Sequence, residues 1–151
     1  MTIINKSAIV PFSAQKMFDL VDDVDSYAEF LPWCSSTESK NRTETSVDGT
    51  LFVTKGKIKL SFSTHNEMKP GQEIKLRLLS GPFKRLTGLW TFTPLKENAC
   101  KVTLRMEFEF SNKVLSLALG FVFSQIANSM LDSFCKRAKN IYTKDGSSRA
   151  V

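Results

Sequence analysis

The chain has 151 residues, which is the size of a single domain that can bury a hydrophobic core. A composition of 42% hydrophobic and 24% charged residues excludes a disordered or low-complexity chain, and the first ten residues lack the apolar run of a secretory signal peptide. The net charge of +6 suits phosphate-rich partners such as RNA or anionic lipid headgroups, although on charge alone a basic soluble surface is the simpler explanation.

The first part of the chain is predicted to hold one strand and two helical segments. Isoleucine and valine recur over Thr2–Val10, a pattern typical of a strand. Ser13 then opens a helix, because its side chain can accept a hydrogen bond from the first turn. We expect this helix to break near Asp25, and a second helical turn over 27–31 to stop at Pro32.

From residue 33 to residue 110 apolar and polar residues alternate, which is typical of antiparallel strands with one face toward water. The predicted strands span 33–41, 46–55, 58–68, 74–79, 83–93 and 101–110. The last is the most regular, because Val102, Leu104 and Met106 point to one face while Thr103 and Arg105 point to the other.

A long helix is predicted over 112–142, with Ser111 or Asn112 as its N-cap and one apolar stripe along its length. Its first half carries a second apolar ridge, formed by Val114, Leu117 and Phe121. Either loops or strand ends bury this ridge, or it forms the lip of a cavity or a docking face for a membrane or a partner. The run over 114–123 is too short to span a bilayer, which takes about 20 apolar residues.

These elements predict one α+β domain over residues 1–143, with a tail over 144–151 that we expect to be disordered. The domain is a curved antiparallel sheet of about seven strands wrapped around the C-terminal helix, with two short helices after the first strand. Such a sheet leaves a cavity wherever it does not meet the helix. Inward-facing aromatic side chains would line this cavity or form ordinary core: Trp33, Phe62, Trp90, Phe92 and Phe108.

Residues that could perform catalysis are scarce in this sequence. The single histidine, His65, falls at a polar-facing strand position, and no nucleophile motif or phosphate-binding glycine loop is present. Cys34, Cys100 and Cys135 lie far apart, in no metal-ligand spacing, which indicates reduced thiols in a cytosolic protein. We therefore expect a protein that binds rather than catalyses, with no metal site.

Basic residues gather at two predicted strand ends. Lys55, Lys57 and Lys59 meet at the hairpin between strands 46–55 and 58–68, and Lys84 and Arg85 lie at the start of strand 83–93. Phosphate contact is one interpretation. Solvated lysines that protect edge strands from aggregation are the other.

Several separated motifs, in the right order, resemble those of the coenzyme-Q-binding START family. They are DVDSYAEFLPWC at 23–34, GPFKRL at 81–86, WTFTPL at 90–95 and FEFSNK at 108–113. The resemblance is greater still to the bacterial branch of this family, the RatA-type ribosome association toxins, and it covers residues 3–142. It implies a helix-grip fold of the START and Bet v 1 type.

The resemblance implies two functions of different classes. Eukaryotic relatives bind ubiquinone and support respiration without catalysing a reaction, whereas the bacterial branch binds the large ribosomal subunit and blocks subunit association. Distant relatives of the fold are polyketide cyclases, but no catalytic pair carries over. Our first hypothesis is a non-enzymatic protein that binds ubiquinone or a similar polyprenyl lipid; ribosome binding is the alternative. We expect a cytoplasmic location, with peripheral contact to the inner membrane left open.

Three groups of residues are predicted to carry these functions, with no cofactor beyond the bound lipid. The predicted ligand contacts are Trp33, Phe62, Leu76, Leu78, Trp90, Phe92, Leu104, Met106, Phe108, Leu119 and Phe123. The predicted cavity entrance or membrane contact is Val114, Leu117 and Phe121. The predicted nucleic-acid patch is Lys55, Lys57, Lys59, Lys84 and Arg85. The sequence indicates neither an oligomeric state nor the length of an isoprenoid tail.

Overall fold

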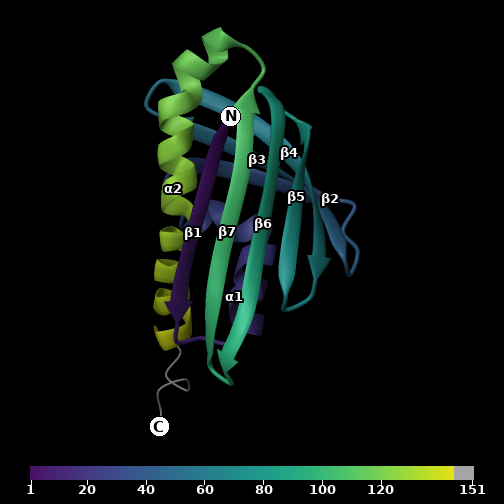
Figure 1. The fold of residues 1–151 in the computed structure, drawn as a ribbon, viewed down its shortest axis with the longest axis vertical. Coiled ribbons are helices and arrows are strands. Elements are labelled where there is room, and N and C mark those ends of the chain that lie inside the picture. Colours follow the sequence, from purple (N-terminus) through teal and green to yellow (C-terminus); the bar gives the residue numbers. More distant parts are fainter. Residues whose placement is uncertain (145–151) are drawn as a thin grey trace.

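A seven-stranded antiparallel sheet curves around one long helix in the computed structural model, which describes residues 1–144 (Figure 1). The elements, in chain order, are β1 (Thr2–Val10), α1 (Ala14–Asp22), the 3₁₀ helix η1 (Val24–Glu29), β2 (Cys34–Lys40), β3 (Ser46–Lys55), β4 (Ile58–Lys69), β5 (Glu73–Ser80), β6 (Phe83–Lys96), β7 (Ala99–Phe110) and α2 (Lys113–Lys144). The predicted α+β helix-grip fold is confirmed. Of the tail predicted over 144–151, residues 145–151 lie outside the described residues.

Both α-helices begin where the sequence places an N-cap. The Ser13 hydroxyl accepts a hydrogen bond from the Lys16 backbone N–H at 3.1 Å, and the Asn112 carboxamide oxygen accepts one from the Leu115 N–H at 2.9 Å. Of the two caps proposed for the long helix, Asn112 is therefore the one used.

The second helical segment differs from the prediction. The break falls at Asp23 instead of near Asp25, and the helical turn expected over 27–31 is a 3₁₀ helix that begins three residues earlier, at Val24. The Ser26 hydroxyl donates to the Asp23 carboxylate at 2.6 Å, and the Tyr27 hydroxyl donates to the Val21 carbonyl. These two bonds draw the chain back against the end of α1 and favour the tighter turn.

The strand order is β1-β7-β6-β5-β4-β3-β2, so the first strand pairs with the last and the sheet edges are β1 and β2. Tight turns at Gly56 and Gly71 join β3 to β4 and β4 to β5, and both glycines have positive φ, a conformation that other residues adopt only with strain. One face of the sheet is open to water, as the alternation predicts.

The other face of the sheet is covered by α2 and α1, and α2 runs beside β1 and β7 (Figure 1). Ala127 and Ala138 on α2 are fully buried, and their small side chains let the helix come close to the sheet. Phe123 lies at the centre of an aromatic cluster. Its ring centroid is 4.8–6.0 Å from those of Phe62, Phe83, Phe108 and Phe110.

Two phenylalanines two residues apart on α2 should therefore differ greatly in their contribution to stability. Phe123→Ala should lower the free energy of unfolding by about 3–5 kcal/mol, because it leaves a cavity inside the aromatic cluster. Phe121→Ala, at an exposed position, should change it by less than about 0.5 kcal/mol. Urea unfolding followed by circular dichroism measures both values, and similar losses for the two variants would contradict this description of the core.

Candidate functional site

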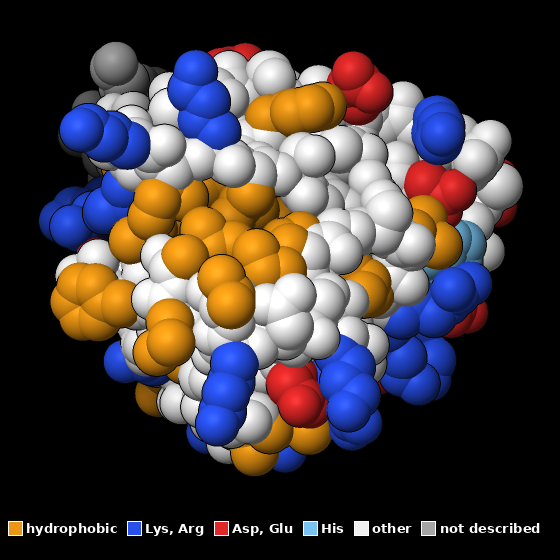
Figure 2. Space-filling model, turned by 90° about the horizontal axis from the view of Figure 1, so that it is seen from above, with side chains coloured by type: hydrophobic (Ala, Val, Ile, Leu, Met, Phe, Trp, Pro, Cys, Tyr) orange, Lys and Arg blue, Asp and Glu red, His pale blue; other side chains and the backbone are white. Residues whose placement is uncertain are grey.

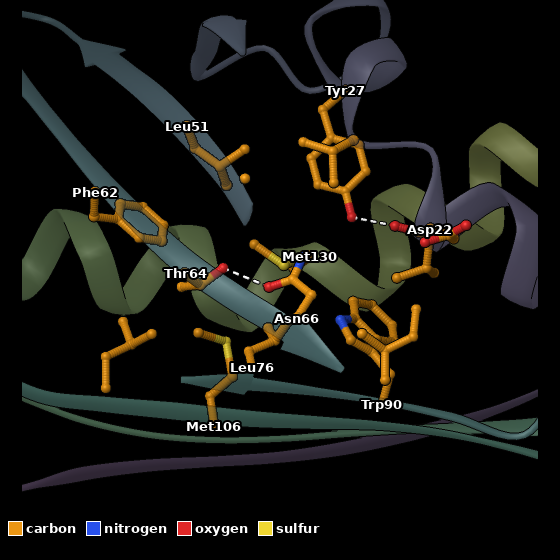
Figure 3. Close-up of a pocket in the computed structure, with 15 residues that line it drawn as sticks. Asp22, Tyr27, Leu51, Phe62, Thr64, Asn66, Leu76, Trp90, Met106 and Met130 are labelled. Atoms are coloured by element: carbon orange, nitrogen blue, oxygen red, sulfur yellow. Dashed lines mark hydrogen bonds between the residues drawn. The ribbon is translucent and has the colours of Figure 1, made fainter. Parts of the chain in front are cut away.

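A partly enclosed cavity lies inside the sheet, between its covered face, α2, the end of α1 and η1 (Figure 3). Its walls are mainly apolar and come from strands β3 to β7, from Val21 and Val24, and from Met130 of α2. The cavity volume is about 50 Å³. This space holds a few water molecules and is far smaller than the roughly 300–1,000 Å³ of a typical small-molecule pocket.

Two buried polar side chains of β4, Thr64 and Asn66, face this cavity (Figure 3). The Thr64 hydroxyl donates to the Asn66 carboxamide oxygen at 2.6 Å. This bond occupies the oxygen and orients the amide nitrogen, whose two N–H groups can serve only as donors. The cavity wall therefore offers a hydrogen bond to an acceptor such as a carbonyl oxygen.

Gly49 on β3 keeps the space near this amide open. A methyl group added there would lie 3.8 Å from Asn66 Nδ2 and 3.4 Å from Val24 Cγ1. Both are ordinary van der Waals distances, so an alanine would fit there by filling part of the space beside the amide.

Tyr27 of η1 closes the cavity on the side of the α1–η1 segment (Figure 3). Burial, followed by the nearby carboxylates of Asp22 and Asp23, raises the pKa of Tyr27 far above its ordinary value of 10.0. The phenol therefore stays protonated at physiological pH and donates to the Val21 carbonyl. It can hold this segment in place, but it cannot act as a base.

Four of the predicted ligand contacts line the cavity: Phe62, Leu76, Trp90 and Met106. The other seven lie outside its lining. Phe92, Leu104, Phe108 and Phe123 are buried core, Leu78 and Leu119 are partly buried against that core, and Trp33 lines a surface groove instead. Alternation indicates which side chains face inward, but it does not separate those at the cavity wall from those packed beyond it.

Sequence reasoning missed the polar lining of the cavity. Thr64 and Asn66 occupy inward positions of β4 between the apolar Phe62 and Met68. A buried polar pair in an apolar series is costly unless it is hydrogen-bonded, and this was the signal that could have identified it.

The second apolar ridge of α2 lies on the surface. Val114 is 74% exposed, Leu117 85% and Phe121 75%. The interpretation in which loops or strand ends bury the ridge is therefore wrong. None of the three lines this cavity, so a role as its entrance stays a prediction.

The basic groups gather at the same end of the molecule as the ridge. Lys55 lines a surface groove together with Phe121. The Ser111 N–H donates to the Pro82 carbonyl at 3.0 Å, which ties the start of α2 to the turn that precedes Lys84. Viewed from this end, hydrophobic side chains gather on the face, with Lys and Arg side chains at several places around them (Figure 2). All five residues of the predicted patch are exposed. Arg85 forms an ion pair with Glu109, with 3.5 Å between Arg85 Nε and Glu109 Oε1.

His65 lies on the water-facing side of the sheet, away from the cavity. Its Nδ1 is 2.6 Å from the Asp48 carboxylate. Hydrogen bonds from Asn41 and then from His65 lower the pKa of Asp48. Within residues 1–144, no group of three or more His, Cys, Asp or Glu side chains is arranged to hold a metal ion.

A curved sheet that grips one helix and encloses an apolar cavity defines the START-like class of proteins. The model of the family "Polyketide cyclase / dehydrase and lipid transport" matches residues 10–135, and the chain belongs to this family. Among solved structures, an aromatase/cyclase, Zhui from Streptomyces sp. R1128, has a TM-score of 0.79 at 16% identity, covering 91% of this chain and 93% of that one. A START superfamily protein from Mycobacterium smegmatis has a TM-score of 0.76 at 15% identity, covering 92% and 98%. At such low identities the likeness shows the fold alone.

Several relatives are more similar in sequence to this chain than these two solved structures are. The ribosome association toxin RatA of Vibrio cholerae is 46% identical over 139 residues, which cover 92% of this chain and 96% of that protein. RatA of Pseudomonas aeruginosa is 43% identical, covering 93% and 98%. A mitochondrial coenzyme Q-binding protein, COQ10 homolog B of Xenopus laevis, is 24% identical, covering 91% of this chain and 58% of that protein. The predicted resemblance to the START-like, RatA-type branch is therefore confirmed.

The buried phenol of Tyr27 should make stability fall at high pH. In the unfolded chain tyrosine ionises near pH 10, whereas in the folded protein the raised pKa keeps the proton bound. Its stabilising contribution is thus complete below pH 10 and is lost as pH rises further, by about 1.4 kcal/mol per pH unit. The difference in unfolding free energy between the wild type and Tyr27→Phe should stay constant from pH 6 to 8 and shift in favour of the variant by pH 11. If the difference in unfolding free energy between the two proteins stayed constant from pH 8 to 11, the raised pKa of Tyr27 would be refuted.

Proposed function

We propose that this protein binds the large ribosomal subunit and blocks its association with the small subunit. The observation that carries the proposal is the 46% identity to a ribosome association toxin over 92% of the chain. An activity on ribosomes also implies a cytoplasmic location.

The charge distribution supports a partner rich in phosphate. Lys55 and Lys57 flank the tight β3–β4 turn, and Lys84 lies at the start of β6; all three are exposed. Cations that displace counterions from nucleic-acid phosphates supply affinity that does not depend on sequence. The water-facing side of the sheet offers no row of aromatic side chains for stacking bases, so contact with the phosphate backbone is the mode that these residues favour.

The side chains of the cavity support binding rather than turnover. Asp22 is ion-paired with Arg42 at 3.1 Å, Tyr27 keeps its proton, and His65 faces the other side of the sheet. The Thr64–Asn66 pair carries no charge. Cyclase-type proton transfer would need an unpaired general acid or base inside the cavity. The carboxylate of Asp22 is engaged by Arg42 and the phenol of Tyr27 by a backbone carbonyl, so neither is free for this role.

Neutralising the basic patch should reduce the salt dependence of ribosome binding. In the variant with Lys55, Lys57, Lys59, Lys84 and Arg85 all changed to Gln, the slope of log affinity against log salt concentration should fall by roughly 0.7–0.9 for each residue that contacts a phosphate. Co-sedimentation with purified large subunits at several KCl concentrations measures this slope.

The matched control removes five exposed lysines elsewhere on the molecule. Lys6, Lys69, Lys96, Lys101 and Lys139 are changed to Gln, so the net charge falls by the same amount. Equal slopes for the two variants would show that only total charge matters and would reject the five-residue patch as the site of phosphate contact. Absence of any binding by the wild type would reject the proposed function itself.

A second candidate function is binding of a lipid that carries a carbonyl group, such as ubiquinone. The Asn66 amide, held by Thr64 inside an apolar cavity, is the specific observation that favours it. The similarity to a coenzyme Q-binding protein also supports it. With a volume of about 50 Å³, the cavity must expand to admit a quinone ring, and the α1–η1 segment with Tyr27 is the wall that can move without breaking the sheet.

Removing the amide donor should weaken binding of a short-chain ubiquinone. Asn66→Leu should raise its Kd about tenfold, because the loss of one buried hydrogen bond to a carbonyl typically costs about that much. Quenching of the intrinsic fluorescence of Trp90, which lines the cavity, can follow the titration. Asn5→Leu, an exposed change on β1, is the control. Mass spectrometry of an organic extract of the freshly purified protein gives an independent check, and an extract without quinone would count against this candidate.

A further inference from the structure

The N-terminal half of α2 exposes an apolar ridge that the core does not need. Val114, Leu117 and Phe121 follow the i, i+3, i+7 spacing of one helix face, and all three are largely exposed. Leu115, Leu119 and Phe123 supply the packing against the sheet from the other side of the helix. Exposed apolar surface costs about 25 cal/mol for each Å² that could be buried, so a contiguous ridge indicates a contact surface.

The helix around this ridge has almost no charge. From Val114 to Leu131 there is no acidic or basic residue, and Lys113 is the charge that precedes this stretch. Over an 18-residue window the mean hydropathy of α2 reaches 1.6. The buried helix of a soluble protein can have an equally high mean hydropathy, but the residues of the ridge do not lie in the core.

Cations surround the ridge. Lys113 is exposed at the start of α2, Lys55 lines a groove with Phe121, and Lys84 follows the turn that is bonded to Ser111. Hydrophobic side chains with lysines and arginines around them are visible on this end of the molecule (Figure 2). One nearby acidic side chain, Glu109, is already paired with Arg85.

One kind of partner is complementary both to the apolar ridge and to the lysines around it. RNA phosphates would pair with the lysines but would leave the ridge in water. A second copy would bring lysines against lysines, and three such side chains expose on the order of 400 Å², about half of what one partner buries in a standard interface. An anionic bilayer offers acyl chains to the ridge and headgroup phosphates to the lysines.

We propose that this end of the protein docks on the surface of an anionic lipid bilayer, with Val114, Leu117 and Phe121 inserted at the level of the upper acyl chains and Lys55, Lys84 and Lys113 on the headgroups. The helix lies on the membrane and does not cross it, because one face of its C-terminal half is packed against the sheet, with Phe134 fully buried. This binding goes beyond the proposed ribosomal function and does not depend on it.

The test uses the full chain and vesicles of phosphatidylcholine with and without 30% phosphatidylglycerol. The wild type should co-sediment with the anionic vesicles, and the binding should weaken with added KCl. The double variant Leu117→Ser, Phe121→Ser should bind the anionic vesicles at least tenfold more weakly. Its control is Ile9→Ser, Leu95→Ser, which removes two exposed apolar side chains at the opposite end of the sheet.

A second variant reports insertion without removing the ridge. Phe121→Trp places a fluorophore on the exposed face, whose emission should shift to shorter wavelength on vesicle binding and be quenched by lipids brominated on their acyl chains. Unchanged emission would overturn the proposal. So would wild-type binding that is equal for neutral and anionic vesicles, or equal binding by the ridge variant and its control.

Two further outcomes would assign the ridge to another partner and so overturn the membrane proposal. One is a ridge variant that loses binding to large ribosomal subunits while keeping its affinity for vesicles. The other is a dimer in light scattering that the ridge variant abolishes. Ribosome co-sedimentation of the same variants separates failure of this proposal from failure of the proposed function, because the membrane proposal expects ribosome binding to be unchanged.

Discussion

The burial of one face of α2 in the hollow of the sheet is the contact on which the rest of the structure depends. Phe123 fills the cluster formed by phenylalanines of β4, β6 and β7, and Phe134 packs against Trp90 with ring centroids 5.2 Å apart. Because a helix rotates by about 100° per residue, fixing these two side chains fixes every other position. The same contact that anchors the helix therefore turns Leu117 and Phe121 toward water.

Pattern reasoning predicted the elements well because their signals are local. Alternation located the six later strands, and capping side chains located both α-helices, whereas η1 depended on the bonds of Ser26 and Tyr27, which no periodicity reveals. For the candidate site the prediction was partial. Whether an inward side chain such as Phe62 or Phe92 reaches the cavity depends on the curvature of the sheet and on where α2 leaves it, and both are properties of the assembled fold.

The inside and the outside of the protein offer different chemistry. Inside, a small apolar cavity presents the Asn66 amide to an acceptor, and a mobile wall would be needed before anything larger than water could enter. Outside, the end of the molecule around α2 combines exposed lysines with exposed apolar side chains. Since the two regions share no described lining residue, a ligand in the cavity and a partner on the surface do not compete for the same groups.

The pairing of the first strand with the last has a consequence for how the chain folds during synthesis. Thr2 lies opposite Phe108, and the whole of β1 is bonded to β7 in this register. The N-terminal strand, with its run of β-branched residues, must therefore stay unpaired until nearly all of the sheet has left the ribosome. Such long-range pairing slows folding and leaves an apolar strand exposed while it waits. The nascent chain is thus open to wrong strand pairing for most of its translation, and its first ten residues are where a chaperone would have the most to protect.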